Sequence, residues 1–385
     1  MEHHSLYQAA TRCRLGSGKT HPACHRVRQL AVLFVLLLAT FSIANAQSNV
    51  SVFASGLNAP RGLKFGHDGF LYVAEGGPHG NTLSTTPDQC DQVPFPVGPY
   101  TGGFLGRISK IDRKGVRHTF ADHLPSSETN PVIGGFVSSV GDVAFIGGHI
   151  YGVLAGAGCS HGLLGTNNGI LEFDRHGNWK MIANLSDFVK AHPVVNPELD
   201  DFEPDGTWYS LVAHEGHLYS TEPNHGEIDQ INQQGVIRRI ADISASQGHV
   251  VPSSLTFHQG SLFTGNLNTF PIVPGSSNIY RVTKHGRVSI FQMGVTTALG
   301  VAFDRKGRLY VLESMTVAGL PSPAQVGSGM IVRFDKSGAE ETIATGLSFP
   351  TAMTFGPDGN LYVSNFGFGA PDGAGQIVKV TVPHD

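Results

Sequence analysis

The stretch FGPDGNLYV, from Phe355 to Val363, reads as two short β segments around an Asp-Gly turn, and it nearly repeats FGHDGFLYV, from Phe65 to Val73. Each copy has an apolar strand end, a Gly-bearing turn and an alternating segment with an aromatic second residue, which is the pattern of a tight hairpin. Four more copies lie between them: FIGGHIYGV (145–153), VAHEGHLYS (212–220), FHQGSLFTG (257–265) and FDRKGRLYV (303–311). The sequence therefore predicts six equivalent hairpins.

A second hairpin pattern follows the copies at variable distance. It begins at Gly106, Gly169, Gly226, Ser277 and Gly329, for example as GILEFDRHGNWKMIA from Gly169. Two hairpins give four strands, and a repeat of roughly 40 to 50 residues with insertions is typical of propeller blades. We therefore expect an all-β, six-bladed β-propeller of the NHL/TolB-like kind.

The last unit, GQIVKVTVPHD from Gly375, ends after its third strand. SVFASGL at 51–57 matches ETIATGL at 341–347, which is the fourth strand of the fifth unit. The N-terminal strand is therefore expected to complete the last blade and close the ring, which also removes an exposed sheet edge.

The N-terminal segment carries the features of an export signal. The apolar run LAVLFVLLLATFSIANA, 30–46, follows Arg26 and Arg28 and ends in Ala-Asn-Ala. We predict a leader and signal peptide at 1–46, a propeller at 47–385, and a periplasmic or extracellular location. A membrane anchor is the alternative, but the run is shorter than the ~20 residues that a bilayer span needs, and no later segment could span a membrane.

The charge of the chain bears on which partners are expected, and its cysteines bear on its cellular compartment. The chain has 26 basic and 30 acidic residues, and removal of 1–46 makes the remainder more acidic, with no basic stripe. A nucleic-acid partner is therefore not expected. In an oxidising compartment Cys90 and Cys159 are candidates for one disulfide, with two free thiols as the alternative.

Strand order predicts two unlike faces. If the strands are called A to D from the axis outward, the A–B and C–D connections are short Gly turns on one face, so the long connections lie on the other. Cys90 and Cys159 fall in equivalent B–C loops of adjacent blades, which makes a bridge geometrically plausible. Function is expected on the long-loop face.

The last residues of the B strands carry a polar signal. Five of the six positions carry a carboxylate or an amide: Glu75, Glu222, Asn266, Glu313 and Asn365. The sixth position is Leu154. In a ring these side chains are expected to converge at the mouth of the channel, where they suit Ca²⁺ or another divalent metal, with Glu75, Glu222 and Glu313 as candidate ligands. The alternative is that they cap loops by accepting hydrogen bonds from backbone N–H groups.

The short B–C loop of the third blade, TEPNHGEI (221–228), adds Asn224 and His225 to this set of binding residues. A His beside a carboxylate can act as a base or ligand, so Glu222 and His225 are the catalytic candidates. The acidic loop NPELDDFEPDG (196–206) imitates a calcium loop but has Val212 at the twelfth position, where a bidentate Glu is required. We interpret it as solvated or locally capped.

Longer segments resemble the ScyD/ScyE family, exported relatives of the NHL-repeat propellers named for a scytonemin gene cluster. The resemblance covers 49–382 and is carried by SGLNAPRGLKFGHDGFLYVAEGG, QCDQVPFPVGPYTGGFLGRISKID, GAGCSHG, FEPDGTWYSLV and EPNHGEIDQI. It implies a six-bladed propeller outside the cytoplasm but no particular reaction.

A broader likeness is to the gluconolactonase and SMP-30 propellers. This resemblance implies a divalent metal in the channel, held by residues where the inner strands begin. At the corresponding positions this sequence has Arg61, Asp142, Ser210, Ser254, Gly300 and Ala352, of which only Asp142 is a good ligand. Virginiamycin-lyase-like propellers share the hairpin pattern as well.

Two hypotheses about function follow. The first is a binding module whose long-loop face takes a small molecule, a glycan or a protein. The second is a divalent-metal-assisted hydrolase or lyase, similar to the SMP-30 and gluconolactonase propellers, that uses Glu75, Glu222, Glu313 and His225. The absence of the common hydrolase motifs favours binding, although fold alone cannot decide.

Overall fold

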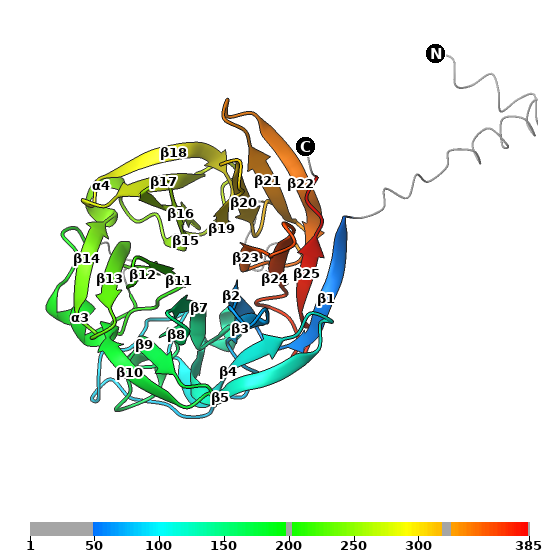
Figure 1. Ribbon diagram of the computed structural model, residues 1–385. Helices are drawn as coiled ribbons and strands as arrows, with labels where there is room; N and C mark the ends of the chain where they lie inside the picture. Colours follow the sequence, from blue (N-terminus) through cyan, green and yellow to red (C-terminus); the bar gives the residue numbers. More distant parts are fainter. Residues whose placement is uncertain (1–48, 198–201, 318–324, 384–385) are drawn as a thin grey trace, which may run out of the picture. The chain divides into compact units, whose positions relative to one another are not determined.

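Six antiparallel sheets are arranged as a ring in the computed structural model, which describes residues 49–197, 202–317 and 325–383 (Figure 1). The predicted six-bladed β-propeller is confirmed. The predicted leader and signal peptide at 1–46 lies outside the described residues.

The blades follow the chain in order, and their strands have these bounds. Blade 1 contains β2 (Pro60–Phe65), β3 (Leu71–Glu75), β4 (Thr101–Ile111), β5 (Arg117–Glu128) and β6 (Val137–Ser138). Blade 2 contains β7 (Val140–Ile146), β8 (His149–Leu154), β9 (Gly169–Phe173) and β10 (Trp179–Asn184). Blade 3 contains β11 (Ser210–His214), β12 (His217–Glu222), β13 (Glu227–Asn232) and β14 (Ile237–Asp242).

The other three blades have the same four-strand order. Blade 4 contains β15 (Pro252–His258), β16 (Ser261–Asn266), β17 (Ser277–Thr283) and β18 (Val288–Val295). Blade 5 contains β19 (Ala298–Phe303), β20 (Leu309–Glu313), β21 (Gly329–Phe334) and β22 (Glu340–Leu347). Blade 6 contains β23 (Ala352–Phe355), β24 (Leu361–Asn365), β25 (Gly375–Val380) and β1 (Val50–Leu57).

The ring closes as predicted, because β1 pairs antiparallel with β25, from Val50 opposite Val380 to Leu57 opposite Gly375. The pairing is visible in Figure 1, where the blue strand lies beside the red one. Leu57 is fully buried in a core cluster with Leu63 of blade 1 and residues of blade 6. The closing strand therefore contributes apolar packing as well as hydrogen bonds.

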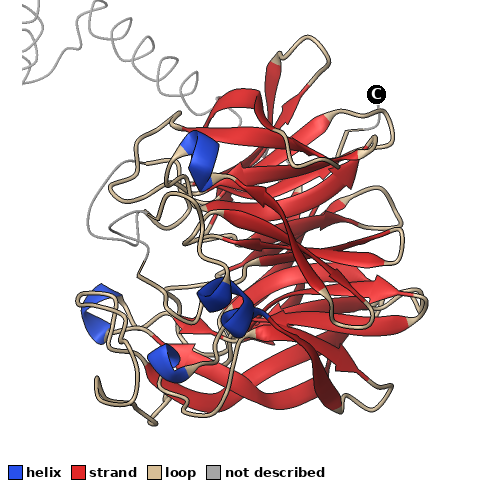
Figure 2. Ribbon diagram, turned by 90° about the vertical axis from the view of Figure 1, so that its left-hand side faces the viewer, coloured by secondary structure: helices blue, strands red, loops and turns tan. Residues whose placement is uncertain are grey.

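The helices and the long connections lie on one face of the ring, and the tight turns lie on the other (Figure 2). The helices are α3 (Leu185–Ala191), α4 (Ser244–Gln247) and two short 3-10 helices, η1 (Pro131–Ile133) and η2 (Cys159–His161). The prediction of two unlike faces is thus confirmed, and we call the face with the long connections the loop face.

Blade 1 has five strands in place of the four expected, because its outer hairpin is long. Strands β4 and β5 have 11 and 12 residues, and their ends extend beyond the other blades, where β5 pairs with β6. Gly102 in this extension lies so close to blade 2 that a Cβ there would be 2.6 Å from the side chain of Leu163. The missing side chain thus allows blade 1 to pack against the loop of blade 2.

The aromatic second residue of the repeat packs between neighbouring blades. The ring of Tyr362 makes edge contacts with Phe53 and Phe65, each at 5.0 Å between centroids, and Phe263 contacts Phe303 at 4.8 Å. Such contacts bury large apolar surfaces. The repeated aromatic residue of the hairpin pattern therefore holds adjacent sheets together.

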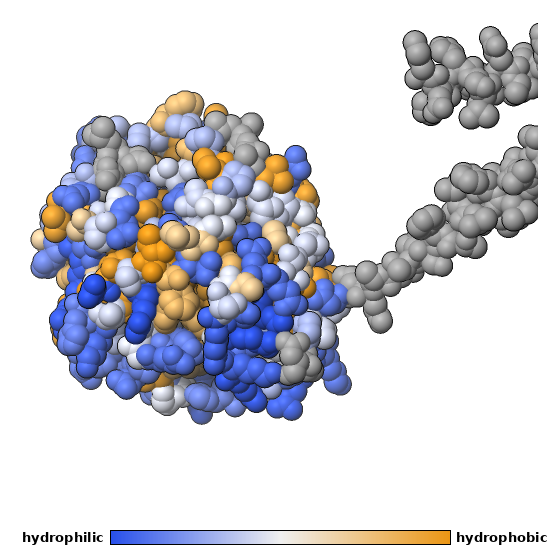
Figure 3. Space-filling model, turned by 90° about the horizontal axis from the view of Figure 1, so that it is seen from above, coloured by the Kyte–Doolittle hydropathy of each residue, from blue (hydrophilic) through white to orange (hydrophobic). Residues whose placement is uncertain are grey.

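The outer surface of the ring is mixed in polarity. Figure 3 views the ring from the side on which β18 lies in Figure 1, and apolar side chains are gathered there among polar ones. On β18 itself Ile290, Phe291 and Met293 are exposed. No helix within the described residues is long and apolar enough to cross a membrane.

Replacement of Leu57 by Ala should lower the free energy of unfolding by about 3 kcal/mol, because it leaves a cavity in the closing strand. Val52→Ala on the same strand is the control, since Val52 is 59% exposed and its truncation should change stability by less than about 0.5 kcal/mol. Urea unfolding measures both. Equal, small effects would contradict the packing of β1 into the ring.

Candidate functional site

The polar residues that end the B strands are buried and hydrogen-bonded to backbone groups nearby. Four of them accept a bond from a backbone N–H in the connection that leads into the A strand of the same blade: Glu75 from Asn58 (2.7 Å), Glu222 from Thr207 (2.8 Å), Glu313 from Thr296 (2.7 Å) and Asn365 from Ser348 (2.7 Å). The fifth, Asn266, accepts from the N–H of Asn278 and donates to the carbonyl of Val250. These contacts fit the capping interpretation.

The structure does not bring Glu75, Glu222 and Glu313 together as candidate metal ligands. Glu75 is held by Arg107, whose Nε and guanidinium nitrogen lie 2.9 and 2.5 Å from its two oxygens. Within the described ranges no group of three or more His, Cys, Asp or Glu side chains is placed to hold a metal ion. The three glutamates therefore do not form a metal-binding group in the part of the chain that the structure describes.

Glu222 and His225 do meet, with 3.2 Å between the Glu222 carboxylate and Nδ1 of His225. Burial alone would raise the pKa of Glu222, but the charge of His225 and the N–H groups of Thr207 and His225 lower it overall. The carboxylate is fully buried. Asn224, the other residue predicted in this loop, is buried, and its Nδ2 has no hydrogen-bond partner among the described residues.

Two further carboxyl groups lie buried in β13 of blade 3. Glu227 forms an ion pair with Arg239, and Asp229 accepts a bond from Nε1 of Trp208 at 3.4 Å. Burial raises the pKa of both groups, and the negative charge of Asp229 raises that of Glu227 further. Both residues are fully buried.

Asp142, the best ligand among the first positions of the inner strands, is fully engaged. Its carboxylate lies 3.0 Å from Nζ of Lys64 and accepts bonds from the N–H groups of Val143 (2.8 Å) and Leu211 (3.0 Å). The neighbouring inner-strand positions supply no second carboxylate. The residues present therefore do not fit the divalent metal that the gluconolactonase likeness implies, and we derive no step through one.

A mostly apolar cavity lies where the channel opens onto the loop face. Its volume is about 540 Å³, and we call it the mouth pocket. All six blades and their connections contribute to its lining: Arg61, Pro96, Val97, Thr129, Val132, Ile133, Phe136, Phe202, Tyr209, Pro223, Val251, Ser253, Leu267, Phe270, Leu299, Met315 and Phe368. Cavities of this size and polarity are typical of sites for small organic molecules.

The floor of the mouth pocket is formed by the first residues of the inner strands and the positions just before them. Arg61, Tyr209, Ser253 and Leu299 come from four different blades. Tyr209 and Leu299 also line a much smaller cavity of about 30 Å³, to which Asp142 contributes. A molecule in the mouth pocket would therefore enter from the loop face.

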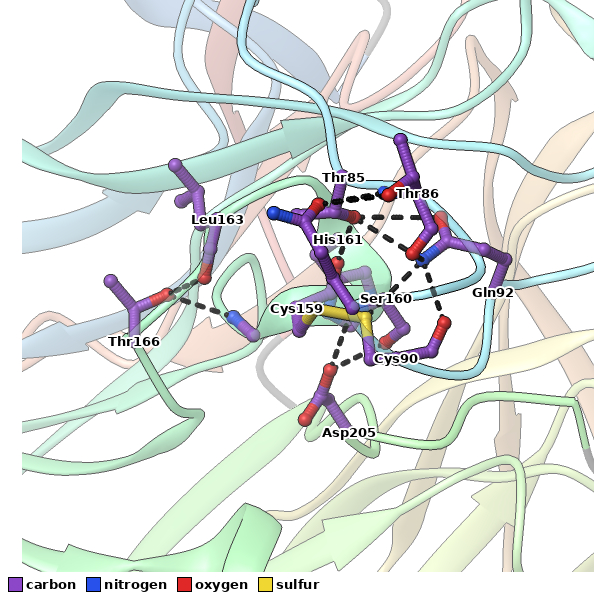
Figure 4. The surroundings of a disulfide bond; sticks show 12 residues. Thr85, Thr86, Cys90, Gln92, Cys159, Ser160, His161, Leu163, Thr166 and Asp205 are labelled. Carbon is purple, nitrogen blue, oxygen red and sulfur yellow. Dashed lines mark hydrogen bonds between the residues drawn. A yellow bond between two sulfur atoms is a disulfide. The ribbon is translucent and has the colours of Figure 1, made fainter.

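A disulfide holds one side of this face. Cys90 and Cys159 are bonded, as predicted, with 6.2 Å between their Cα atoms (Figure 4). The bond joins the long loop of blade 1, which contributes Pro96 and Val97 to the pocket, to η2 of blade 2. Closure of a loop of this length stabilises a fold by ~4 kcal/mol in the chain-entropy model.

The part of the acidic loop from Phe202 to Gly206 lies beside this disulfide, and its Glu203 and Asp205 are buried, which fits the locally capped interpretation and not the solvated one. Asp205 accepts bonds from the backbone N–H and the hydroxyl of Ser160, both at 2.7 Å (Figure 4). Glu203 accepts from the hydroxyl of Tyr100 at 2.6 Å and lies 2.9 Å from Nε2 of His161. These carboxylates tie the loops of blades 1 and 2 to the connection that carries Phe202. Asp201 lies outside the described residues.

His161 is the imidazole partner of Glu203 in this network. Burial alone would lower the pKa of His161, but the carboxylate of Glu203 raises it overall. The imidazole also stacks on the ring of Tyr100, with 4.9 Å between centroids. The network is closed on itself and does not line the mouth pocket, so we regard it as the support of the pocket wall.

Comparisons with solved structures show the fold. A proposed oxidoreductase (glucose dehydrogenase) from Thermus thermophilus has a TM-score of 0.52 and 17% identity, and the match covers 86% of this chain and 99% of that one. A gluconolactonase from Xanthomonas campestris (TM-score 0.48, 11% identity, 87% and 89% covered) and a virginiamycin B lyase from Staphylococcus aureus (0.47, 15%, 87% and 99%) are also similar. No protein-family model and no curated protein sequence matches the chain. The structural neighbours are six-bladed propellers, and the resemblance to the ScyD/ScyE family stays a prediction.

None of the residues predicted to bind lines the mouth pocket, although Pro223 and Leu267 directly follow two of them. The pocket residues were missed because apolar loop residues carry no distinctive pattern. Arg61 could have been found, since it lies near the start of an inner strand where the other blades have small or acidic residues.

Burial raises the pKa of Glu313 to about 7 from its usual value of 4.5. The native state then binds more protons than the unfolded state between these values, so the free energy of unfolding falls as the pH rises from 4.5 through 7. Glu313→Gln keeps an acceptor for Thr296 but cannot ionise. Its free energy of unfolding relative to that of wild type should therefore rise by about 2 kcal/mol between pH 5 and pH 8.5.

Urea unfolding at the two pH values measures this difference, and Glu215→Gln is the control because Glu215 is exposed. An equal difference between Glu313→Gln and wild type at both pH values would show that the pKa of Glu313 is not raised in the folded protein.

Proposed function

We propose that this propeller is an exported binding protein whose loop face takes a small, largely apolar molecule in the mouth pocket. The observation that carries the proposal is the cavity of about 540 Å³. Of the lining residues named above, 12 are apolar residues, aromatic residues and prolines included, that come from the loops. The remaining lining residues form the floor and the rim. Burial of apolar ligand surface there supplies the main driving force, at roughly 25 cal/mol per Å².

The walls support binding because they are held in place before any ligand arrives. Phe136 and Phe368 come from different blades and meet edge to face, with 5.6 Å between ring centroids. The disulfide and the network around Glu203 restrain the loops that carry Val97 and Phe202. A preorganised pocket loses less conformational entropy when it binds.

The lining also bears on the kind of partner. A glycan presents many hydroxyl groups that need hydrogen-bond partners, and this pocket offers few polar side chains for them. An apolar molecule leaves no such group unsatisfied. We therefore favour an apolar small molecule over a glycan or a protein.

Export is proposed because the apolar run at 30–46 has the pattern of a signal peptide and because Cys90 and Cys159 are disulfide-bonded, which is typical of oxidising compartments. A periplasmic or extracellular location would agree with the resemblance to the ScyD/ScyE family. The metal-assisted hydrolase or lyase is not adopted, because the side chains near the channel do not fit its metal.

The neutral fluorophore N-phenyl-1-naphthylamine should bind the wild-type protein with a rise in emission. Val132→Asp at the pocket rim should weaken this binding at least about tenfold, because an apolar ligand would remove the new charge from water. Val132 is 69% exposed, so the fold should tolerate the change.

The matched control is Val236→Asp, because Val236 is 63% exposed and lies on a turn between β13 and β14, away from the pocket lining. It should bind the fluorophore as wild type does. No binding by wild type, or equal binding by the two variants, would contradict the proposed function.

A further inference from the structure

The polar groups on the floor of the mouth pocket differ in what they can still bind. The hydroxyl of Tyr209 donates to the carbonyl of Thr351 at 2.7 Å, and that of Ser253 donates to the carbonyl of Ala298 at 2.5 Å. Both hydroxyl protons are therefore used within the protein. Burial raises the pKa of Tyr209 well above its usual value, so the phenol stays neutral.

Arg61 keeps most of its donors. A guanidinium has five N–H groups, and one terminal nitrogen of Arg61 donates to the carbonyl of Val137 at 2.7 Å. Among the described residues no other bond from this side chain to the protein is found. Its remaining N–H groups are available to a molecule in the pocket, which Arg61 lines.

The charge of Arg61 also lacks a nearby carboxylate. It is the one charged side chain among the described residues of the pocket lining. Asp142, which lines the smaller cavity, is paired with Lys64 at 3.0 Å. A guanidinium remains protonated at neutral pH, and an unpaired charge against apolar walls is costly unless a partner of opposite sign joins it.

We propose that the ligand of the mouth pocket is an apolar organic acid, with an aromatic or aliphatic body against the phenylalanine walls and one carboxylate paired with Arg61. This inference rests on the proposed function. A single carboxylate is specified because the floor offers a single cation, and the planar guanidinium fork matches the two oxygens of a carboxylate.

Isothermal titration with 2-naphthoate and its neutral analogue 2-naphthamide tests the proposal on the wild-type protein at pH 7. The naphthoate should bind at least about tenfold more tightly, as expected for a charge-assisted hydrogen bond. Arg61→Met should bring the two affinities within about twofold of each other and leave the affinity for naphthamide unchanged. Arg175→Met is the control, since Arg175 is exposed on the turn between β9 and β10, and it should keep the wild-type preference.

The outcomes separate this inference from the proposed function. Equal affinities of wild type for the two compounds would overturn the inference while the binding of naphthamide still supported an apolar site. A preference for naphthoate that persists in Arg61→Met would also overturn it. Binding of neither compound would contradict the proposed function itself. The wild-type comparison needs no variant, so the test holds even if Arg61→Met does not fold.

Discussion

Antiparallel hydrogen bonds between β1 and β25 join the two ends of the described chain, and the arrangement of every blade depends on them. Without β1 the sixth sheet would have three strands and an open edge, which is a template for association with other chains. With β1 in place the sheets form a closed ring (Figure 1). Closure brings the long connections of all six blades around a single opening, and the mouth pocket exists only because these connections meet there.

The buried carboxylates show how the ring meets a second constraint. Each long connection leaves backbone N–H groups that need acceptors. Glu75, Glu222 and Glu313 supply them from the ends of the B strands, and Glu203 and Asp205 do the same for side chains and backbone of neighbouring loops. These buried carboxylates thus stabilise the loop face by accepting hydrogen bonds. They do not line the mouth pocket, whose walls are apolar.

The fold could be predicted from the sequence because the hairpin repeats specify the strands. Closure could be predicted because the last unit lacks a fourth strand and the N-terminal segment has the pattern of one. The site could be predicted only in part. The pattern placed Glu75 and Glu313 at the ends of strands, but sequence position does not give the backbone N–H groups with which these side chains pair. The fifth strand of blade 1 was missed because β6 consists of two residues and depends on the length of β5. Phe136, Phe202 and Phe368 come together only in three dimensions.

Hydrogen exchange followed by mass spectrometry measures the closure most directly, since it reports the opening of individual strands in the unmodified protein. The account predicts that the amides of β25, and those amides of β1 that are hydrogen-bonded to β25, exchange as slowly as those of β24, because all three strands belong to one sheet. Rapid exchange of β1 and of the facing edge of β25, with β24 still protected, would contradict it. In that case the ring would be open, and the connections would not be held around a single pocket.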